Sequence, residues 1–377
     1  MSERRGKDLK DVLFALALLV ILAYFYRVQL AYQFDNGDDY EWYAEAMQRD
    51  SLGKVFDFRF DSTTNLRTYF NPVQTLVWRF MIGNFDRAPV PYHTLCILLL
   101  LVDALVFFVV ARLFLGDAML SFLAALSFGL FHPNVRTVAW ISAGISHGLL
   151  ALTFLMSFYF FVKYVRSGQK PHYCLSIGFF ALGLFTKDVF MFLTPIFIVY
   201  YALFKDRKKD GVRERLMAAF KAFIPFLVLA CLRSYIFLSR LGESAALRDW
   251  GGVNLSIHAL YRFIDYLVFL VSVNHVGDGL NLFIAYGLIA ILPFLAYYLS
   301  KDRVSSLLLL WIAFSIIPFI FSNFRPIEGL GRYLFLASMP WFMLIYYLIS
   351  RVHHRVHRLL FLLMAVSYTI VFNLVAV

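Results

Sequence analysis

The sequence predicts an all-α protein that crosses a membrane about eleven times. Hydrophobic residues make up 61% of the 377 residues and charged residues only 16%, and the mean hydropathy is +0.71. A soluble domain with this composition would expose large apolar patches to water. Several apolar runs approach the roughly 20 residues that cross a hydrocarbon core of about 30 Å. Backbone polar groups find no water there, so these runs must be helical.

The expected spans follow one another along the chain, separated by short polar loops. They cover residues 12–31, 93–113, 117–131, 137–162, 172–186, 188–204, 216–239, 279–299, 304–322, 333–350 and 358–376. The first is too long for a signal-peptide core and is expected to stay as an anchor. The third and fifth are short, which predicts helices that stop below one interface. The apolar stretch 257–273 carries Arg262 and Asp265, so we expect an interfacial or re-entrant helix there.

Lysine and arginine in the short loops predict the orientation of the chain. The N-terminus, with Arg4, Arg5, Lys7 and Lys10, is expected in the cytoplasm. Counting alternately then places the basic loops on the same side, at 112–117, 163–170, 205–215, 301–303 and 351–358. The other side holds the long loop 32–92, the region 240–278, and short turns at 132–136, 187 and 323–332. Both long regions are expected to contain interfacial helices.

The formal net charge of +11 would suggest nucleic acid in a soluble protein, but here it follows from topology. We therefore expect no nucleic-acid partner. The three cysteines lie in apolar runs and are expected as small buried residues. Residues 1–377 are expected to form one transmembrane domain, and the compact chain without repeats favours a bacterial inner membrane over an endoplasmic reticulum.

Unusual polar residues gather in loops on the predicted non-cytoplasmic side. Four segments carry them: Asp38 and Asp39; His132 and Arg136; Lys187 and Asp188; and Arg325, Glu328 and Arg332. Because these loops share one side, we expect their side chains to meet at the same rim of the membrane. This convergence is the main functional signal in the sequence.

The adjacent carboxylates of Asp38 and Asp39 could serve as a general base or hold a divalent cation such as Mg²⁺ or Mn²⁺. The competing interpretation is a polar turn after the first helix. Lys187, Arg136 and Arg332 could bind a lipid phosphate, because charge-assisted contacts to phosphate are strong. Their competing interpretation is contact with lipid head groups.

Two polar residues lie inside expected spans, Asp103 in the second and His147 in the fourth. Such residues are costly in lipid, so each should face the interior of the helix bundle. A structural hydrogen bond between helices is favoured for both over a catalytic role.

The order of four motifs resembles a known group of enzymes. An acidic first loop is followed by the turn Phe131-His-Pro133 with Val138-Ala-Trp-Ile-Ser142, by Lys187-Asp188, and by Arg332-Tyr-Leu-Phe-Leu336. Over residues 30–340 this order is similar to the GT-C superfamily of membrane glycosyltransferases. Within that superfamily the chain resembles the protein O-mannosyltransferase-like group and the transmembrane O-mannosyltransferases with tetratricopeptide repeats.

The resemblance implies a polyprenyl-phosphate sugar donor, a hydroxyl acceptor on a glycan, lipid or protein, and inversion at the sugar carbon. An aspartate of the first loop would be the catalytic base, which maps to Asp38 or Asp39. Lys187 and Arg332 would face the donor phosphate, with Arg136 as a third candidate. Supporting roles would fall to His132, Asp188, Tyr333, Arg67 and His147.

The chain also departs from this pattern. Arg136 stands where the relatives have a glutamate, and Ala143-Gly-Ile-Ser-His147 replaces their Gly-Arg-x-Asp. Asn71-Pro-Val73 replaces an Arg-Pro-Leu, with Arg67 as a substitute one turn earlier, and the C-terminal repeats are absent. The alternatives are a lipid-linked saccharide ligase or polymerase, a transporter or flippase, and a scaffold that binds lipid-linked sugar without turnover.

Overall fold

The computed structural model describes residues 2–34, 37–64, 70–205, 212–241, 257–271, 301–320, 332–352 and 354–374. Within these ranges every regular element is a helix. The elements are α1 (Ser2–Tyr26), η1 (Arg27–Ala31), α2 (Asp38–Gln48), α3 (Leu52–Phe56), α4 (Pro72–Phe85), α5 (Pro89–Leu115), α6 (Ala118–Leu130), α7 (His132–Ala139), α8 (Ile141–Ser167), α9 (Lys170–Leu184), η3 (Asp188–Leu193), α10 (Thr194–Phe204), α11 (Val212–Leu241), α13 (Ile257–Val271), α15 (Arg303–Ile320), η4 (Arg332–Leu334), α16 (Phe335–Ser350) and α17 (Arg355–Leu374).

Six helical segments in the described ranges are long and apolar enough to cross a membrane. They are Leu9–Ala31, Pro89–Leu115, Ile141–Ser167, Met217–Ile236, Arg303–Ile320 and Arg332–Ser350. A seventh would be formed by α6 and α7 together, which are bent by 52° at their junction. The protein is therefore an all-α, multi-pass membrane protein. Helices cover the other expected spans in whole or in part, except 279–299, which lies outside the described residues.

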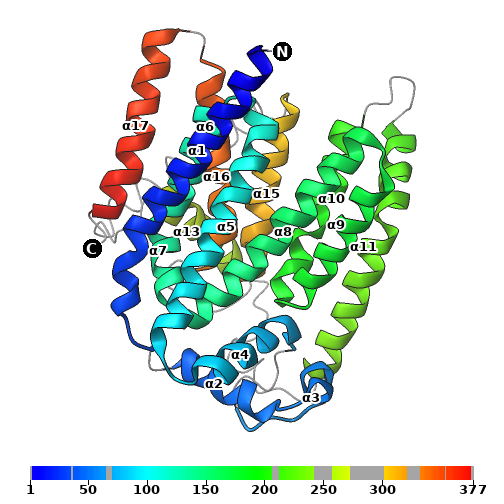
Figure 1. The fold of residues 1–377 in the computed structure, drawn as a ribbon. Helices are drawn as coiled ribbons and strands as arrows, with labels where there is room; N and C mark the ends of the chain where they lie inside the picture. Colours follow the sequence, from blue (N-terminus) through cyan, green and yellow to red (C-terminus); the bar gives the residue numbers. More distant parts are fainter. Residues whose placement is uncertain are drawn as a thin grey trace.

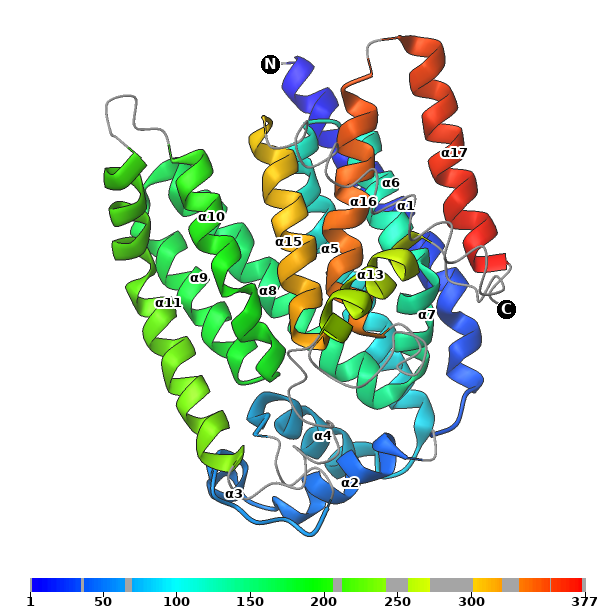
Figure 2. The same cartoon turned by 180° about the vertical axis from the view of Figure 1, so that it is seen from behind.

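The long helices form an upright bundle, and α2, α3 and α4 form a layer across one of its ends (Figure 1). The N-terminus, the end of α16 and the start of α17 lie at the opposite end in both views (Figures 1 and 2). The expected long first loop is thus a set of short helices, as predicted. Helix α15 also begins at the end that carries the N-terminus (Figure 2).

The turn predicted at 132–136 is wrong. Residues His132–Ala139 form a separate helix, α7, and the fourth expected span begins at Ile141 instead of 137. Pro133 lies in the first turn of α7, where its missing N–H would have had no partner within the helix. Proline thus starts a new helix here as well as ending the previous one, and Trp140 makes the break before α8.

The layer of short helices is held together by a buried ion pair. Glu45 on α2 and Arg49, the residue that follows α2, lie 2.6 Å apart, and both are nearly inaccessible to water. The second carboxylate oxygen of Glu45 accepts a hydrogen bond from Thr64, and Arg49 donates to the Lys54 carbonyl. Because these contacts tie the ends of α2 and α3 to the loop that follows them, the layer is a defined platform.

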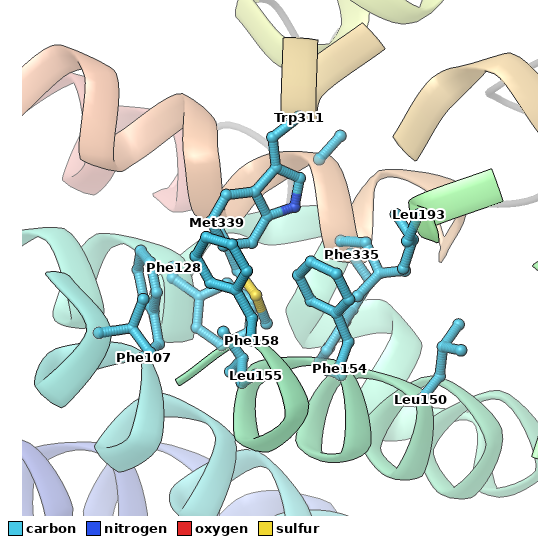
Figure 3. Packing of buried hydrophobic residues seen from close by; sticks show 14 of the residues in the cluster. Phe107, Phe128, Leu150, Phe154, Leu155, Phe158, Leu193, Trp311, Phe335 and Met339 are labelled. Atoms are coloured by element: carbon cyan, nitrogen blue, oxygen red, sulfur yellow. The ribbon is translucent and has the colours of Figure 1, made fainter. Parts of the chain in front are cut away.

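The core of the bundle consists of tightly packed aromatic side chains (Figure 3). Trp311 of α15 lies with its ring centroid 5.1 Å from that of Phe154 and 5.2 Å from that of Phe158, both on α8. Phe335, the first residue of α16, packs against Phe128 of α6 at 5.2 Å. The first two contacts join α8 to α15, and the third joins α6 to α16, which begins directly after η4.

The stretch expected as an interfacial or re-entrant segment is helical in its described part. Helix α13 spans Ile257–Val271 and is shorter than the six candidate spans. Its Tyr266 ring lies 6.2 Å from Phe319 of α15. Figure 2 shows α13 lying across α15 and α16, which agrees with a helix that packs onto the bundle without spanning it.

Candidate active site

Four polar side chains from different elements meet where the bundle faces the layer of short helices. Asp38 lies on α2, His147 on α8 and Arg332 on η4, and Lys187 is the residue that precedes η3. We call these four residues the polar cluster. Each pair in contact is separated by 40 or more positions in sequence. The expected convergence of Asp38, Lys187 and Arg332 is therefore present in the structure.

Asp39 holds the start of α2 against the start of α8. Its Oδ1 accepts a hydrogen bond of 2.7 Å from the backbone N–H of Ser142, in the first turn of α8. The first N–H groups of a helix have no partner within it, and a carboxylate there also interacts favourably with the helix dipole. Asp39 is fully buried. It therefore acts as an N-terminal cap supplied by another helix.

Asp38 is next in sequence but has a different environment. Its side chain is 47% exposed, and its Oδ2 lies 3.2 Å from Nη1 of Arg332. Because Asp39 turns into the protein to cap α8, its neighbour at the start of α2 remains at the accessible surface. The two carboxylates thus face different partners, and only that of Asp38 is open to a ligand.

Arg332 is held by aromatic rings as well as by Asp38. Its guanidinium lies 4.4 Å from the centre of the Trp140 ring, and Nη2 donates to the Tyr333 hydroxyl at 3.2 Å. Cation–π contacts of this kind orient an arginine while leaving N–H groups at its edge for other partners. Trp140 is also the residue that separates α7 from α8, so the bend in the chain places this ring under the arginine.

Lys187 contacts only neutral groups among the described residues. Its Nζ lies 2.9 Å from Nε2 of His147 and 3.3 Å from the Ser146 hydroxyl. Burial and, to a smaller extent, the nearby Arg332 charge lower the pKa of Lys187 to about 7, although Asp38 and Asp188 act in the opposite direction. A buried ammonium without a carboxylate contact is costly. This lysine is therefore the position in the cluster where an added anion would be stabilised most.

Asp188 is not part of the polar cluster. It forms an ion pair with Arg233 of α11, which also donates to Asn71 at the start of α4. Sequence reasoning missed Arg233, although an arginine inside the apolar run 216–239 carried the same signal that singled out Asp103 and His147.

Other predicted residues lie elsewhere. Arg136 is exposed on α7, and no contact joins it to the polar cluster among the described residues. His132 is buried at the start of α7. Tyr333 touches Arg332 and so lies beside the cluster. Arg67, Arg325 and Glu328 lie outside the described residues.

Both intramembrane polar residues are buried inside the protein, as expected. The hydrogen bond between helices predicted for Asp103 is not found among the described residues, since its fully buried carboxyl has no partner there. His147 contacts Lys187 in the polar cluster. The general reason is that a buried position in a span does not specify which neighbour a polar group meets.

A divalent cation, the alternative to a general base in the first loop, would use Asp38 and Asp39 together. Asp38 faces Arg332, whereas Asp39 faces the N-terminus of α8. Within the described ranges no group of three or more His, Cys, Asp or Glu residues is arranged to hold a metal ion. The residues present therefore do not fit a cation chelated by this pair.

Replacing Asp39 by alanine should destabilise the protein, because the buried Ser142 N–H would lose its acceptor. We expect a loss of about 1–3 kcal/mol, measured as a lower midpoint of thermal unfolding in detergent. Asp39→Asn keeps an oxygen that can accept this bond and should lose clearly less. Equal melting of the wild type and both variants would show that the cap contributes nothing.

No protein-family model matches this chain, and no curated protein is significantly similar to it. The function must therefore be inferred from the residues of the polar cluster and their geometry.

Proposed function

We propose that this protein is a membrane glycosyltransferase of the GT-C type. It would transfer a sugar from a polyprenyl-phosphate donor to a hydroxyl group of a glycan, lipid or protein acceptor. The observation that carries the proposal is the polar cluster: a partly exposed carboxylate, Asp38, lies 3.2 Å from Arg332 and near Lys187, a cation in contact only with neutral groups among the described residues.

The side of the membrane is part of the proposal. The cluster lies at the end of the bundle opposite to the N-terminus (Figure 1). The basic loops predict that the N-terminal end faces the cytoplasm. The reaction would then take place on the non-cytoplasmic face, as expected of a bacterial inner-membrane enzyme that uses a lipid carrier for its sugar.

Lys187 and Arg332 have the chemistry of a phosphate site. Arginine offers several N–H groups in a plane, and a lysine ammonium is a compact charge; both bind phosphate oxygens through charge-assisted hydrogen bonds. Both side chains are held in place before any ligand arrives. Trp140 holds Arg332, and His147 holds Lys187. Preformed cations of this kind stabilise charge that develops in a transition state.

The proposed reaction is a single displacement at the anomeric carbon. The acceptor oxygen forms the new bond to that carbon while the bond to the donor phosphate oxygen breaks. The bonding electron pair leaves with the polyprenyl phosphate, whose growing negative charge is stabilised by Lys187 and Arg332. The acceptor proton passes to Asp38. One displacement inverts the configuration of the sugar carbon.

Asp38 is a better candidate for the base than Asp39. A base must come within hydrogen-bond reach of the acceptor hydroxyl, and only Asp38 is accessible. Its ion pair with Arg332 fits the same reaction. A phosphate bound to Arg332 would compete with Asp38 for the guanidinium and so release the carboxylate to accept a proton.

Asp38→Asn should abolish sugar transfer, because an amide cannot take the acceptor proton. Asp39→Asn should retain transfer, since the cap on α8 survives in weaker form. Transfer is measured by mass spectrometry of glycolipids and glycoproteins in membranes from cells with and without each variant, at matched protein levels. Wild-type turnover by Asp38→Asn would remove the base assignment, and no sugar change on deleting the gene would remove the proposed function.

Binding of a polyprenyl-phosphate sugar should weaken as the pH rises through about 7, because only the cationic form of Lys187 attracts phosphate. The ammonium is present below that pH and is lost above it. Affinity is measured in detergent between pH 6 and 9. Lys187→Arg should remove this pH dependence while keeping the charge, and Lys187→Met should weaken binding at every pH. A flat profile in the wild type would contradict the role of Lys187.

A further inference from the structure

Arg233 is a buried charge inside an apolar helix. It lies on α11 within the candidate span Met217–Ile236, and its side chain is only 1% exposed. An arginine at such a position is costly in lipid unless partners inside the protein compensate its charge. The compensating carboxylate is Asp188, with which Arg233 forms an ion pair. The guanidinium also lies 5.4 Å from the centre of the Phe70 ring.

Arg233 connects two segments that are far apart in the sequence, the start of α4 and the start of η3. The same Nη2 atom that contacts Asp188 donates to Oδ1 of Asn71 at 3.3 Å. Asn71 precedes the first residue of α4, while Asp188 is the first residue of η3. Through these two contacts, α11 holds the platform helix α4 against the turn that follows α9.

Two further contacts show that this junction is closely packed. The backbone N–H of Val73 donates to the Phe185 carbonyl at 3.2 Å, and the rings of Phe70 and Phe185 lie 6.2 Å apart. Phe185 and Asp188 flank Lys187 closely in sequence. The backbone that carries the phosphate-binding lysine is therefore fixed on both sides by α4 and α11.

The ion pair also decides what the neighbouring lysine meets. Asp188 is adjacent to Lys187, yet its carboxylate is engaged by Arg233 and Lys187 contacts His147 and Ser146 instead. A free carboxylate beside a buried ammonium would attract it strongly. A direct contact between Asp188 and Lys187 would neutralise the positive charge that the donor phosphate is proposed to bind.

We propose that Arg233 is a positioning residue: by binding Asp188 and Asn71 together, it fixes the turn that carries Lys187 and keeps Asp188 from neutralising the lysine. The role of Lys187 in binding phosphate rests on the function proposed above. The contacts of Arg233 with Asp188 and Asn71 are independent of that proposal. Arg233 acts through Asp188 and is not proposed to touch the substrate.

The charged and titratable groups around Lys187 come from every neighbouring element. They are Asp38 of α2, His147 of α8, Asp188 of η3 and Arg332 of η4, with Arg233 of α11 reaching the lysine through Asp188. Asp38 and Asp188 both raise the pKa of Lys187, which burial and Arg332 lower to about 7. Removing the charge of Arg233 and removing the charge of Asp188 should therefore shift the titration of Lys187 in opposite directions.

The test is the titration of Lys187 in two variants. Arg233→Gln leaves the Asp188 carboxylate uncompensated beside the ammonium, so the midpoint should rise by about one pH unit. Asp188→Asn removes the carboxylate and leaves the Arg233 charge, so the midpoint should fall. The double variant should lie between the two. The midpoint comes from the pH dependence of acetic anhydride labelling of Lys187, followed by mass spectrometry of the full-length protein in detergent.

Exposed Lys170 serves as the internal control and should label equally in all variants. If the Arg233–Asp188 pair were merely structural, both single variants would loosen the turn, expose Lys187 and raise the midpoint of its titration. That result would overturn the proposal. The absence of a shift in both variants would also overturn it. Arg233→Lys keeps the charge and should titrate like the wild type if Arg233→Gln fails to fold. Opposite shifts without any donor binding would support the role of Arg233 and reject the proposed function.

Discussion

The arrangement of the candidate site depends on one hydrogen bond, from the backbone N–H of Ser142 to the carboxylate of Asp39. It joins the first turn of the platform helix α2 to the first turn of the membrane helix α8. Because adjacent residues in a helix's first turn point in different directions, burial of Asp39 leaves Asp38 at the surface, beside Arg332. The same contact fixes the start of α8, whose next turns carry Ser146 and His147. A single cap thus places groups from two elements, α2 and α8.

The charges around the site are distributed unevenly among their partners. Asp38 pairs with Arg332, and Asp188 pairs with Arg233, but Lys187 contacts neutral atoms among the described residues. In water such a difference would matter little, since the solvent screens each charge. In a desolvated position it makes the lysine the most favourable place for an incoming anion. In the proposed function, the two ion pairs contribute by leaving Lys187 without a carboxylate contact among the described residues.

The sequence predicted the fold class and most residues of the polar cluster, but not which side chains pair there. Apolar runs indicated helices, and the polar residues at their ends indicated Asp38, Lys187 and Arg332, because length and hydropathy constrain membrane helices strongly. Residues 132–136 were expected as a turn, since Pro133 can end one helix or begin the next. Periodicity could not show that Asp39 caps α8, nor that Asp188 meets Arg233 across the bundle. Such contacts depend on how helices pack, which sequence spacing alone does not define.

The proposed function requires the polar cluster to bind the phosphate of a lipid-linked sugar whose anomeric carbon faces Asp38. The most direct measurement is a cryo-electron microscopy structure of the protein with a non-hydrolysable polyprenyl-phosphate sugar analogue. The account predicts phosphate oxygens about 3 Å from Lys187 Nζ and from the Arg332 guanidinium, with Asp38 released from its ion pair and facing the sugar. A phosphate bound at the N-terminal end of the bundle, or one that touches neither cation, would contradict it.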